Sequence, residues 1–180
     1  MPRRTDRSCR AGTPLPAKSA EGGLTSRGRE HLRRLDRVFA DLPGPVYYLT
    51  SCVHYREKVL ANPAAAGVLV EAWRTSPEVY GWAVGRYVVM PDHVHFFATP
   101  WREDEKTLSA FIGSWKRWTK RHLIDAGLRD FEWQPEFFDH VLRSDESYSQ
   151  KWEYVRQNPV RGRLVAVPEE WPYQGELVVF

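Results

Sequence analysis

The sequence contains little cysteine: two residues in 180, Cys9 and Cys52. Neither has a second cysteine at the spacing of a metal site, and two cysteines provide no disulfide framework. No run approaches the roughly 18 to 20 apolar residues that a membrane-spanning helix needs, and the basic amino terminus lacks the apolar run of a signal peptide. These absences argue against a disulfide-stapled secreted domain and against a membrane protein, so we expect a protein of the reducing cytoplasm.

A large excess of one charge is also missing. The chain has 26 Lys and Arg against 23 Asp and Glu, and its net charge of +3 suits an anionic partner without requiring one. The basic residues nevertheless gather in two places. The first group lies among the first 37 residues and is equally consistent with a solvated tail. The second group is Lys116, Arg117, Lys120 and Arg121, which we predict to contact DNA phosphates.

The apolar content is sufficient for a core, with 42% hydrophobic and 13% aromatic residues. A chain of this length usually forms one domain. Residues 1–27 are rich in Arg, Pro, Gly, Ser and Thr and have no apolar periodicity, which predicts a flexible basic arm. We therefore expect one folded domain over residues 28–180, ending in a carboxy-terminal tail.

The hydrophobic pattern predicts strands and helices in a recognisable order. Asn62 and Pro63 have the residue types of a helix cap and a first helical residue, and Pro91-Asp92 has those of a turn between two strands. The expected strands are 46–53, 79–90, 93–99 and one within 131–142, and the expected helices are 64–74, 108–123 and one from Ser144 or Asp145 to Pro159. This order predicts an α+β fold with a ferredoxin-like βαββαβ antiparallel sheet and an added carboxy-terminal helix.

A pair of histidines lies within one predicted strand. Because alternate side chains of a strand share a face, His93 and His95 project together while Val94 points into the opposite layer. Two neutral imidazoles at this separation can bind one divalent ion. The alternative is a pair of histidines on a polar sheet face without a metal.

The last predicted helix carries a second candidate pair. Tyr154 and Asn158 are four residues apart and so share a helical face, where the carboxamide can serve as a third metal ligand and the phenol as a nucleophile. The alternative is a half-buried tyrosine and an asparagine that marks the helix end before Pro159.

Three strings together resemble a known family. They are Tyr87–His95 (YVVMPDHVH), Tyr154–Gly162 (YVRQNPVRG) and Pro168–Tyr173 (PEEWPY). In this order and separation they are similar to the REP-associated tyrosine transposases, a branch of the IS200-like single-tyrosine HUH transposases. The resemblance runs from about Val46 to Tyr173. Asp92 departs from it, since asparagine is more usual there, and the arginine-rich arm lies outside it.

The resemblance implies an activity and a site. It implies a metal-dependent single-strand DNA endonuclease and strand transferase that acts on hairpin DNA, such as repeated palindromic elements, through a 5′-phosphotyrosine intermediate. His93, His95 and Asn158 then correspond to the ligands of Mg²⁺ or Mn²⁺, and Tyr154 to the nucleophile. The protein is expected to act as a monomer or a homodimer.

Two other functions remain open from the sequence. One is a domesticated protein that binds nucleic-acid hairpins without cutting them. The other is an unrelated metal hydrolase in which Tyr154 only packs. The presence of His93, His95, Tyr154 and Asn158 together favours retained cleavage chemistry.

Overall fold

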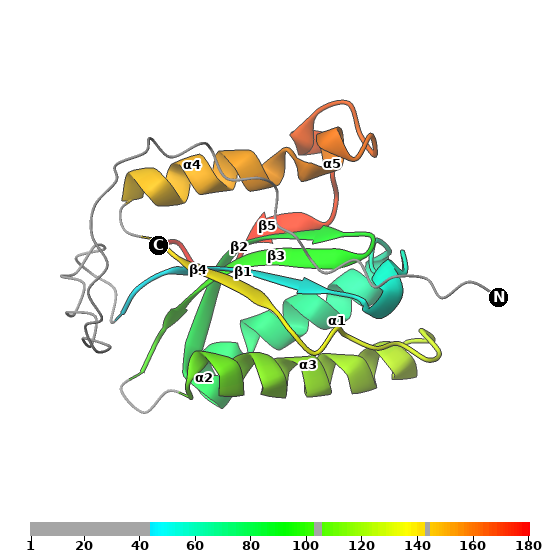
Figure 1. Cartoon of the computed structure of the whole chain (residues 1–180), viewed down its shortest axis with the longest axis horizontal. Helices are drawn as coiled ribbons and strands as arrows, with labels where there is room; N and C mark the ends of the chain where they lie inside the picture. Colours follow the sequence, from blue (N-terminus) through cyan, green and yellow to red (C-terminus); the bar gives the residue numbers. More distant parts are fainter. Residues whose placement is uncertain (1–43, 103–105, 143–144) are drawn as a thin grey trace, which may run out of the picture.

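The computed structural model describes residues 44–102, 106–142 and 145–180, with the side chains of 145 and 146 excepted. Cys9, the predicted arm 1–27 and the predicted domain boundary at residue 28 lie outside the described residues. Figure 1 shows one sheet between two helical layers, with α1, α2 and α3 on one side and α4 and α5 on the other. Within the described residues, no helix combines the length and the apolar character that crossing a membrane requires.

The sheet confirms the predicted α+β fold. Its strands are β1 (Tyr47–Cys52), β2 (Trp82–Met90), β3 (His93–Pro100), β4 (Phe138–Val141) and β5 (Gln174–Glu176). They lie in the order β4-β1-β3-β2-β5, and every neighbouring pair is antiparallel. The first four have the order of a ferredoxin-like sheet. β5 is an additional edge strand that the hydrophobic pattern did not predict, because three residues with a central glycine carry no strand pattern.

The helices are α1 (Pro63–Arg74), α2 (Ser76–Tyr80), α3 (Leu108–Asp125), α4 (Asp145–Arg156) and α5 (Asn158–Arg161), with 3₁₀ turns η1 (His54–Arg56) and η2 (Pro168–Glu170). The start of α1 follows the prediction. The Asn62 side chain accepts a hydrogen bond from the Ala65 amide at 2.9 Å, and Pro63 is the first helical residue.

Two predicted boundaries are wrong. The strand expected from Val79 begins only at Trp82, because Val79 and Tyr80 belong to α2, which ends at Gly81 in the left-handed conformation with φ 73°. The last helix was expected to run to Pro159, but α4 ends at Arg156. Pro159 instead lies in the first turn of α5, where its missing N–H leaves no hydrogen bond unmade.

Alternate side chains along each strand point to opposite faces of the sheet. On what we call the α3 face, Phe96 and Leu49 pack with Trp73 of α1 and Trp115 of α3, whose rings stack with centroids 5.8 Å apart. On the opposite face, called the α4 face, the core is smaller. Its buried members are Val46, Tyr48, Val88, Met90, Phe97, Leu142, Tyr148, Val155 and Trp171. His93, His95 and Phe97 are alternate residues of β3, so the two histidines lie on the α4 face with Phe97.

The carboxy-terminal segment covers the outer edge of β2. The Trp171 indole N–H donates to the Val89 carbonyl at 3.0 Å, and the Val89 amide donates to the Tyr173 carbonyl at 2.8 Å. β5 then pairs with β2 over Arg86, Tyr87 and Val88. The segment predicted as a tail is therefore part of the sheet.

Candidate active site

The two histidines form a close pair on the α4 face. Their Nε2 atoms are 3.0 Å apart, and the ring planes are inclined by 81°. Both lie at the beginning of β3, next to the Pro91-Asp92 turn, and Thr50 of β1 is directly opposite His95 in the register. The predicted geometry of this pair, with both imidazoles on one face, is present.

Asp92 orients the imidazole of His93. His93 Nδ1 lies 2.6 Å from Asp92 Oδ1, and Arg56 Nε lies 2.9 Å from Asp92 Oδ2. Burial opposes ionisation of this carboxyl, but the hydrogen bond from His93 and the charges of His93 and Arg56 outweigh it and lower the pKa of Asp92. An ionised carboxylate only accepts hydrogen bonds, so Nδ1 of His93 donates to it, and in the neutral ring the Nε2 lone pair is left free.

Two hydroxyl groups contact the other imidazole. His95 is buried, and its Nδ1 lies 2.8 Å from both Tyr48 Oη and Thr50 Oγ1. Burial lowers the pKa of His95 well below its usual value, which makes the neutral ring the stable form. Burial also raises the pKa of Tyr48 to about 12. With Nδ1–H directed at a hydroxyl oxygen, His95 also points its Nε2 lone pair at the site.

This arrangement fits a divalent cation. At 3.0 Å the two Nε2 atoms can share a hydrogen bond if His95 carries its proton on Nε2, whereas with Nδ1–H on both rings their two lone pairs are free to bind one cation. An ion about 2.1 Å from each nitrogen, with the two bonds at about a right angle, requires a separation of about 3.0 Å. Among the described residues no group of three or more His, Cys, Asp or Glu side chains is placed to hold a metal. A further protein ligand would therefore have to be of another type, such as a carboxamide.

Tyr154 lies on α4, which covers the face of the sheet that carries this pair. Its side chain is 48% exposed, and the Arg161 guanidinium lies over its ring, 4.1 Å from the centroid. Lys151 Nζ lies 4.5 Å from the ring centroid of Tyr48 and 5.6 Å from that of Tyr154. Its ammonium is therefore close both to Tyr154 and to Tyr48, the tyrosine that contacts His95. A phenol that is 48% exposed does not support the alternative in which Tyr154 only packs.

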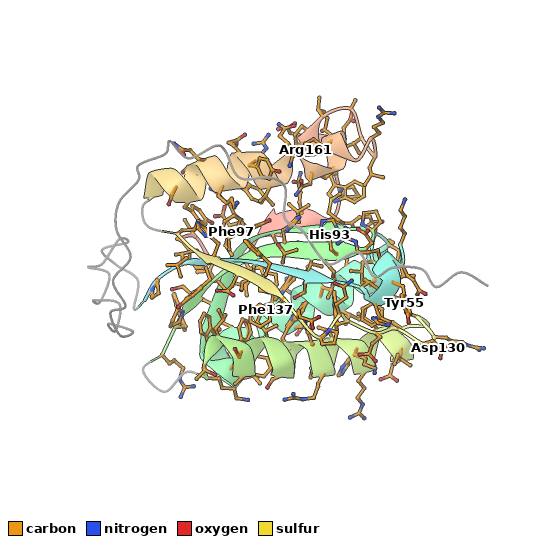
Figure 2. All side chains as sticks on the ribbon, viewed as in Figure 1. Tyr55, His93, Phe97, Asp130, Phe137 and Arg161 are labelled. Atoms are coloured by element: carbon orange, nitrogen blue, oxygen red, sulfur yellow. The ribbon has the colours of Figure 1, made fainter. Side chains whose placement is uncertain are left out.

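Asn158 is on α5 rather than on the same helix as Tyr154. Its Oδ1 accepts a hydrogen bond from Arg161 Nη2, which also donates to the Tyr154 carbonyl at 2.7 Å. Its Nδ2 is buried and makes no hydrogen bond to any described residue. The carboxamide oxygen keeps a second lone pair, and this lone pair is what it would need to bind a metal ion. Figure 2 shows Arg161 in the helical layer above the sheet end that carries His93.

The basic cluster of α3 does not join this site. α3 covers the opposite face of the sheet (Figure 1), and Arg117 and Arg121 are exposed there. Lys120 forms an ion pair with Glu132. The expectation that Lys116 contacts phosphate must be revised, because this residue is buried and its ammonium donates to the carbonyls of Gln134, Pro135 and Glu136 at 2.8, 3.2 and 2.7 Å.

The sequence reading missed several residues of the site. Tyr48, Thr50 and Arg56 reach the histidines only through the pairing of β1 with β3 and the turn after β1, so spacing alone gives no signal for them. Lys151 is different, because it precedes Tyr154 by three residues on one helix and its nearness to Tyr154 follows from helical spacing. Arg161 was quoted only as part of a motif, although it contacts both Tyr154 and Asn158.

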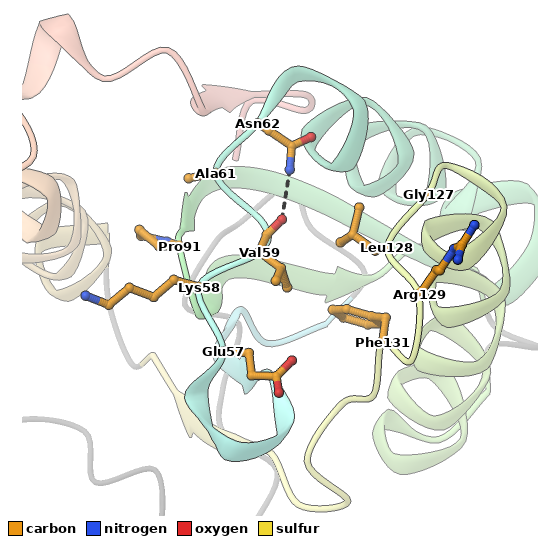
Figure 3. A pocket seen from close by; sticks show the side chains of 10 residues that line it. All are labelled: Glu57, Lys58, Val59, Ala61, Asn62, Pro91, Gly127, Leu128, Arg129 and Phe131. Carbon is orange, nitrogen blue, oxygen red and sulfur yellow. Dashed lines mark hydrogen bonds between the residues drawn. The ribbon is translucent and has the colours of Figure 1, made fainter.

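A cavity of about 630 Å³ lies beside the β2–β3 turn (Figure 3). Its lining residues are Glu57, Lys58, Val59, Ala61, Asn62, Pro91, Gly127, Leu128, Arg129 and Phe131. None of the predicted site residues lines it. The candidate site is therefore the group of polar side chains on the α4 face, and not this cavity.

A ferredoxin-like sheet, paired imidazoles on a central strand and a tyrosine on a helix above them form the architecture expected of a single-tyrosine HUH enzyme. A family described as "Transposase IS200 like" matches residues 45–158, and the chain belongs to this family. The matched segment begins just before β1 and ends at Asn158, so it includes all four predicted catalytic and metal-binding positions.

Individual relatives confirm the resemblance to REP-associated tyrosine transposases. A protein of that name from Escherichia coli K12 is 30% identical over 91 residues, which are 50% of this chain and 52% of the relative. A putative one from Haemophilus influenzae Rd is 23% identical over 113 residues, 57% of this chain and 63% of the relative. The chain thus spans between half and two thirds of the length of these relatives.

A solved structure supports the fold. It is described as the structure of the REP-associated tyrosine transposase bound to a REP hairpin, and it matches with a TM-score of 0.61 at 20% identity. The match covers 87% of this chain and 95% of the other. At this identity the likeness establishes the shared fold and leaves the roles of individual residues to be argued from the geometry above.

Proposed function

We propose that this chain is a transposase that nicks and rejoins single-stranded DNA at a hairpin, with His93, His95 and Asn158 holding Mg²⁺ or Mn²⁺ and Tyr154 as the nucleophile. The observation that carries the proposal is the 3.0 Å approach of two Nε2 atoms on the face that the Tyr154 helix covers. Family membership supports the same activity. The protein would work as a monomer or a homodimer on DNA in the cytoplasm.

The donor set suits either ion. Mg²⁺ prefers oxygen ligands and Mn²⁺ accepts imidazole more readily, so two imidazoles and one carboxamide fit both, with Mn²⁺ the better match. When bound, the ion supplies polarisation of the scissile phosphate and stabilises the charge of the leaving oxygen. The contacts of Asp92, Tyr48 and Thr50 orient the two rings toward that position.

The cleavage step forms one bond and breaks another. The Tyr154 oxygen attacks phosphorus in line, its phenolic proton passes to solvent, the bond from phosphorus to the 3′ oxygen breaks, and that oxygen is protonated. The product is a tyrosine linked to the 5′ phosphate and a free 3′ hydroxyl. Attack by a 3′ hydroxyl reverses the step and rejoins strands without ATP. Arg161 and Lys151, which flank the Tyr154 ring, would neutralise the phosphate during attack.

The proposed substrate is a hairpin with single-stranded flanks, as the description of the structural relative suggests. Lys151 and Arg161 are the cations nearest the proposed cleavage point. Arg117, Arg121 and Lys120 on α3 would contact phosphates farther along the DNA, with an affinity that falls as the salt concentration rises. Lys116 is excluded from this set by its burial.

Covalent trapping tests the proposal against a hairpin-binding protein that does not cut. The protein is incubated with labelled hairpin DNA and Mn²⁺, denatured, and examined for a protein–DNA adduct. Tyr154→Phe should abolish the adduct. Tyr55→Phe is the matched control, because Tyr55 is also an exposed tyrosine, at 78%, and should retain it.

Two results would overturn the proposal. An adduct that persists in Tyr154→Phe rejects this residue as the nucleophile. Hairpin binding with a measurable dissociation constant but no adduct, over a panel of hairpins with both ions, favours the domesticated binding protein.

A further inference from the structure

Arg56 directs its side chain into the site rather than toward solvent. Its Nε lies 2.9 Å from Asp92 Oδ2, its Nη1 donates to Cys52 Sγ at 2.8 Å, and its Nη2 lies 3.4 Å from His93 Nδ1. The side chain is 36% exposed, and that of Asp92 is 17% exposed. Nε and Nη1 of Arg56 therefore donate to protein atoms, which is not the arrangement of an arginine presented to bind DNA phosphate.

The backbone that carries Arg56 is strained. Tyr55 has φ 52° and Arg56 has φ 58°, so two successive residues with side chains adopt the left-handed conformation that favours glycine. The Arg56 amide donates to the Val53 carbonyl at 3.0 Å, and the His54 amide donates to the Glu132 carbonyl at 2.8 Å. The turn is thus fixed at both ends. Strain that persists next to a functional site indicates that the side chain position matters.

We propose that Arg56 is a positioning residue, which acts through Asp92 to hold His93 in the Nδ1–H tautomer and so sets the affinity of the site for a divalent metal ion. This inference rests on the proposed metal site. Arg56 does not touch the metal or the DNA in this account. Its guanidinium fixes one oxygen of Asp92, and the other oxygen is thereby aimed at His93.

The residue type at position 92 explains why an arginine is needed. The Asp92 side chain is only 17% exposed, and a largely buried carboxylate is costly without a partner charge. Arg56 supplies that charge. In return, a carboxylate cannot donate a hydrogen bond, so it allows only one tautomer of His93, whereas a carboxamide can turn and present either its oxygen or its nitrogen.

Two glycine substitutions separate positioning from backbone strain. Arg56→Gly removes the guanidinium and relieves the positive φ, and Tyr55→Gly relieves the neighbouring positive φ without removing any contact to Asp92 or His93. Mn²⁺ binding to the metal-free full chain, without DNA, is measured by calorimetry. We expect Arg56→Gly to bind Mn²⁺ about 10- to 100-fold more weakly than the parent chain, and Tyr55→Gly to bind it with unchanged affinity. Thermal melting checks that both variants fold.

The outcomes distinguish this inference from the proposed function. If the parent chain binds Mn²⁺ and His95→Ala does not, but Arg56→Gly binds as tightly as the parent, the positioning role is rejected and the metal site stands. If the parent chain does not bind Mn²⁺, or His95→Ala binds it equally well, both the metal site and the positioning role are rejected.

A spectroscopic measurement tests the tautomer without metal. Two-bond ¹H–¹⁵N correlations of the His93 ring should give the Nδ1–H pattern in the parent chain and in Tyr55→Gly. In Arg56→Gly the Asp92 carboxylate is no longer held against His93 and can turn away, so the pattern should shift toward a mixture with the Nε2–H form. An unchanged pattern in Arg56→Gly contradicts the proposal, because a residue with only a structural role would not alter the tautomer.

Discussion

The two faces of the sheet use the same strands for different purposes. On the α3 face, Val94 and Phe96 join a large core with stacked tryptophans from α1 and α3. His93 and His95 alternate with Val94 and Phe96 along β3 and so lie on the α4 face. Their imidazoles form hydrogen bonds with Asp92, Tyr48 and Thr50. One strand thus carries both the stabilising apolar contacts and the polar groups proposed for catalysis.

The comparison explains why a polar site can be tolerated at the centre of a small domain. Buried polar atoms that are hydrogen-bonded add little net stability, whereas the apolar side chains of the α3 face stabilise the fold in proportion to the area they bury. We therefore expect substitutions on the α3 face to change stability more than chemistry, and substitutions on the α4 face to do the reverse.

The largest expected effect is on the α3 face. Trp115→Ala removes a fully buried indole and should lower the free energy of unfolding by about 3 to 5 kcal/mol. Urea denaturation measures it. At a temperature where the variant is folded, Mn²⁺ affinity should stay within a few-fold of that of the parent chain. A large loss of Mn²⁺ affinity in the folded variant would break the proposed separation of the faces.

The reverse effect is expected on the α4 face. His95→Ala should weaken Mn²⁺ binding by at least about 100-fold, because it removes one of two imidazole ligands. The free energy of unfolding should change by less than about 2 kcal/mol, since the loss is mainly of hydrogen bonds to Tyr48 and Thr50. Calorimetry and urea denaturation of the same preparations measure both quantities. Loss of folding without specific loss of metal binding would contradict the assignment.

A pH-dependent effect is expected at Lys116, a buried residue in the middle of α3. Burial lowers the pKa of Lys116 to about 8, whereas the unfolded value is 10.5. Between these two pH values the unfolded chain binds more protons than the folded chain. The contribution of Lys116 to the free energy of unfolding therefore rises with pH. Relative to Lys116→Met, the parent chain should gain about 2 kcal/mol between pH 8 and 10. A difference between the two chains that falls over this range would contradict the pKa shift.

The smallest expected effects concern DNA affinity. Arg117→Gln and Arg121→Gln on α3 should each weaken hairpin binding a few-fold and reduce the salt dependence of binding by about one phosphate contact. Lys151→Gln near Tyr154 should weaken binding by more, because it lies at the proposed cleavage point. Fluorescence anisotropy over a series of salt concentrations ranks the three. Equal effects would indicate that the DNA follows both faces.

Much of the fold was predictable from local patterns. Asn62 and Pro63 located the start of α1, and the alternation of His93, Val94 and His95 assigned the two faces of β3. The start of β2 was misplaced, because Val79 and Tyr80 have strand-forming side chains and the left-handed turn at Gly81 overrides them. Local preference is a weak guide where a helix and a strand adjoin.

The site was only partly predictable. The proposed metal ligands His93 and His95 and the proposed nucleophile follow from spacing and resemblance. The groups that orient the two histidines come from β1 and from the strained turn at Arg56, which only the tertiary fold brings near. Lys116 is a residue that the sequence wrongly assigned to the DNA-binding surface. Its neighbours in the sequence predict an exposed basic helix, and only the course of residues 134–136 buries its ammonium.

The central claim is that the phenol of Tyr154 lies within reach of an ion held by His93 and His95. ¹⁹F relaxation of the chain labelled with 3-fluorotyrosine, with Mn²⁺ added, tests it most directly. The signals of Tyr154 and Tyr48 should broaden strongly, that of Tyr80 behind the α3 face should broaden least, and His95→Ala should remove the difference. Equal broadening of the Tyr154 and Tyr80 signals would contradict the account.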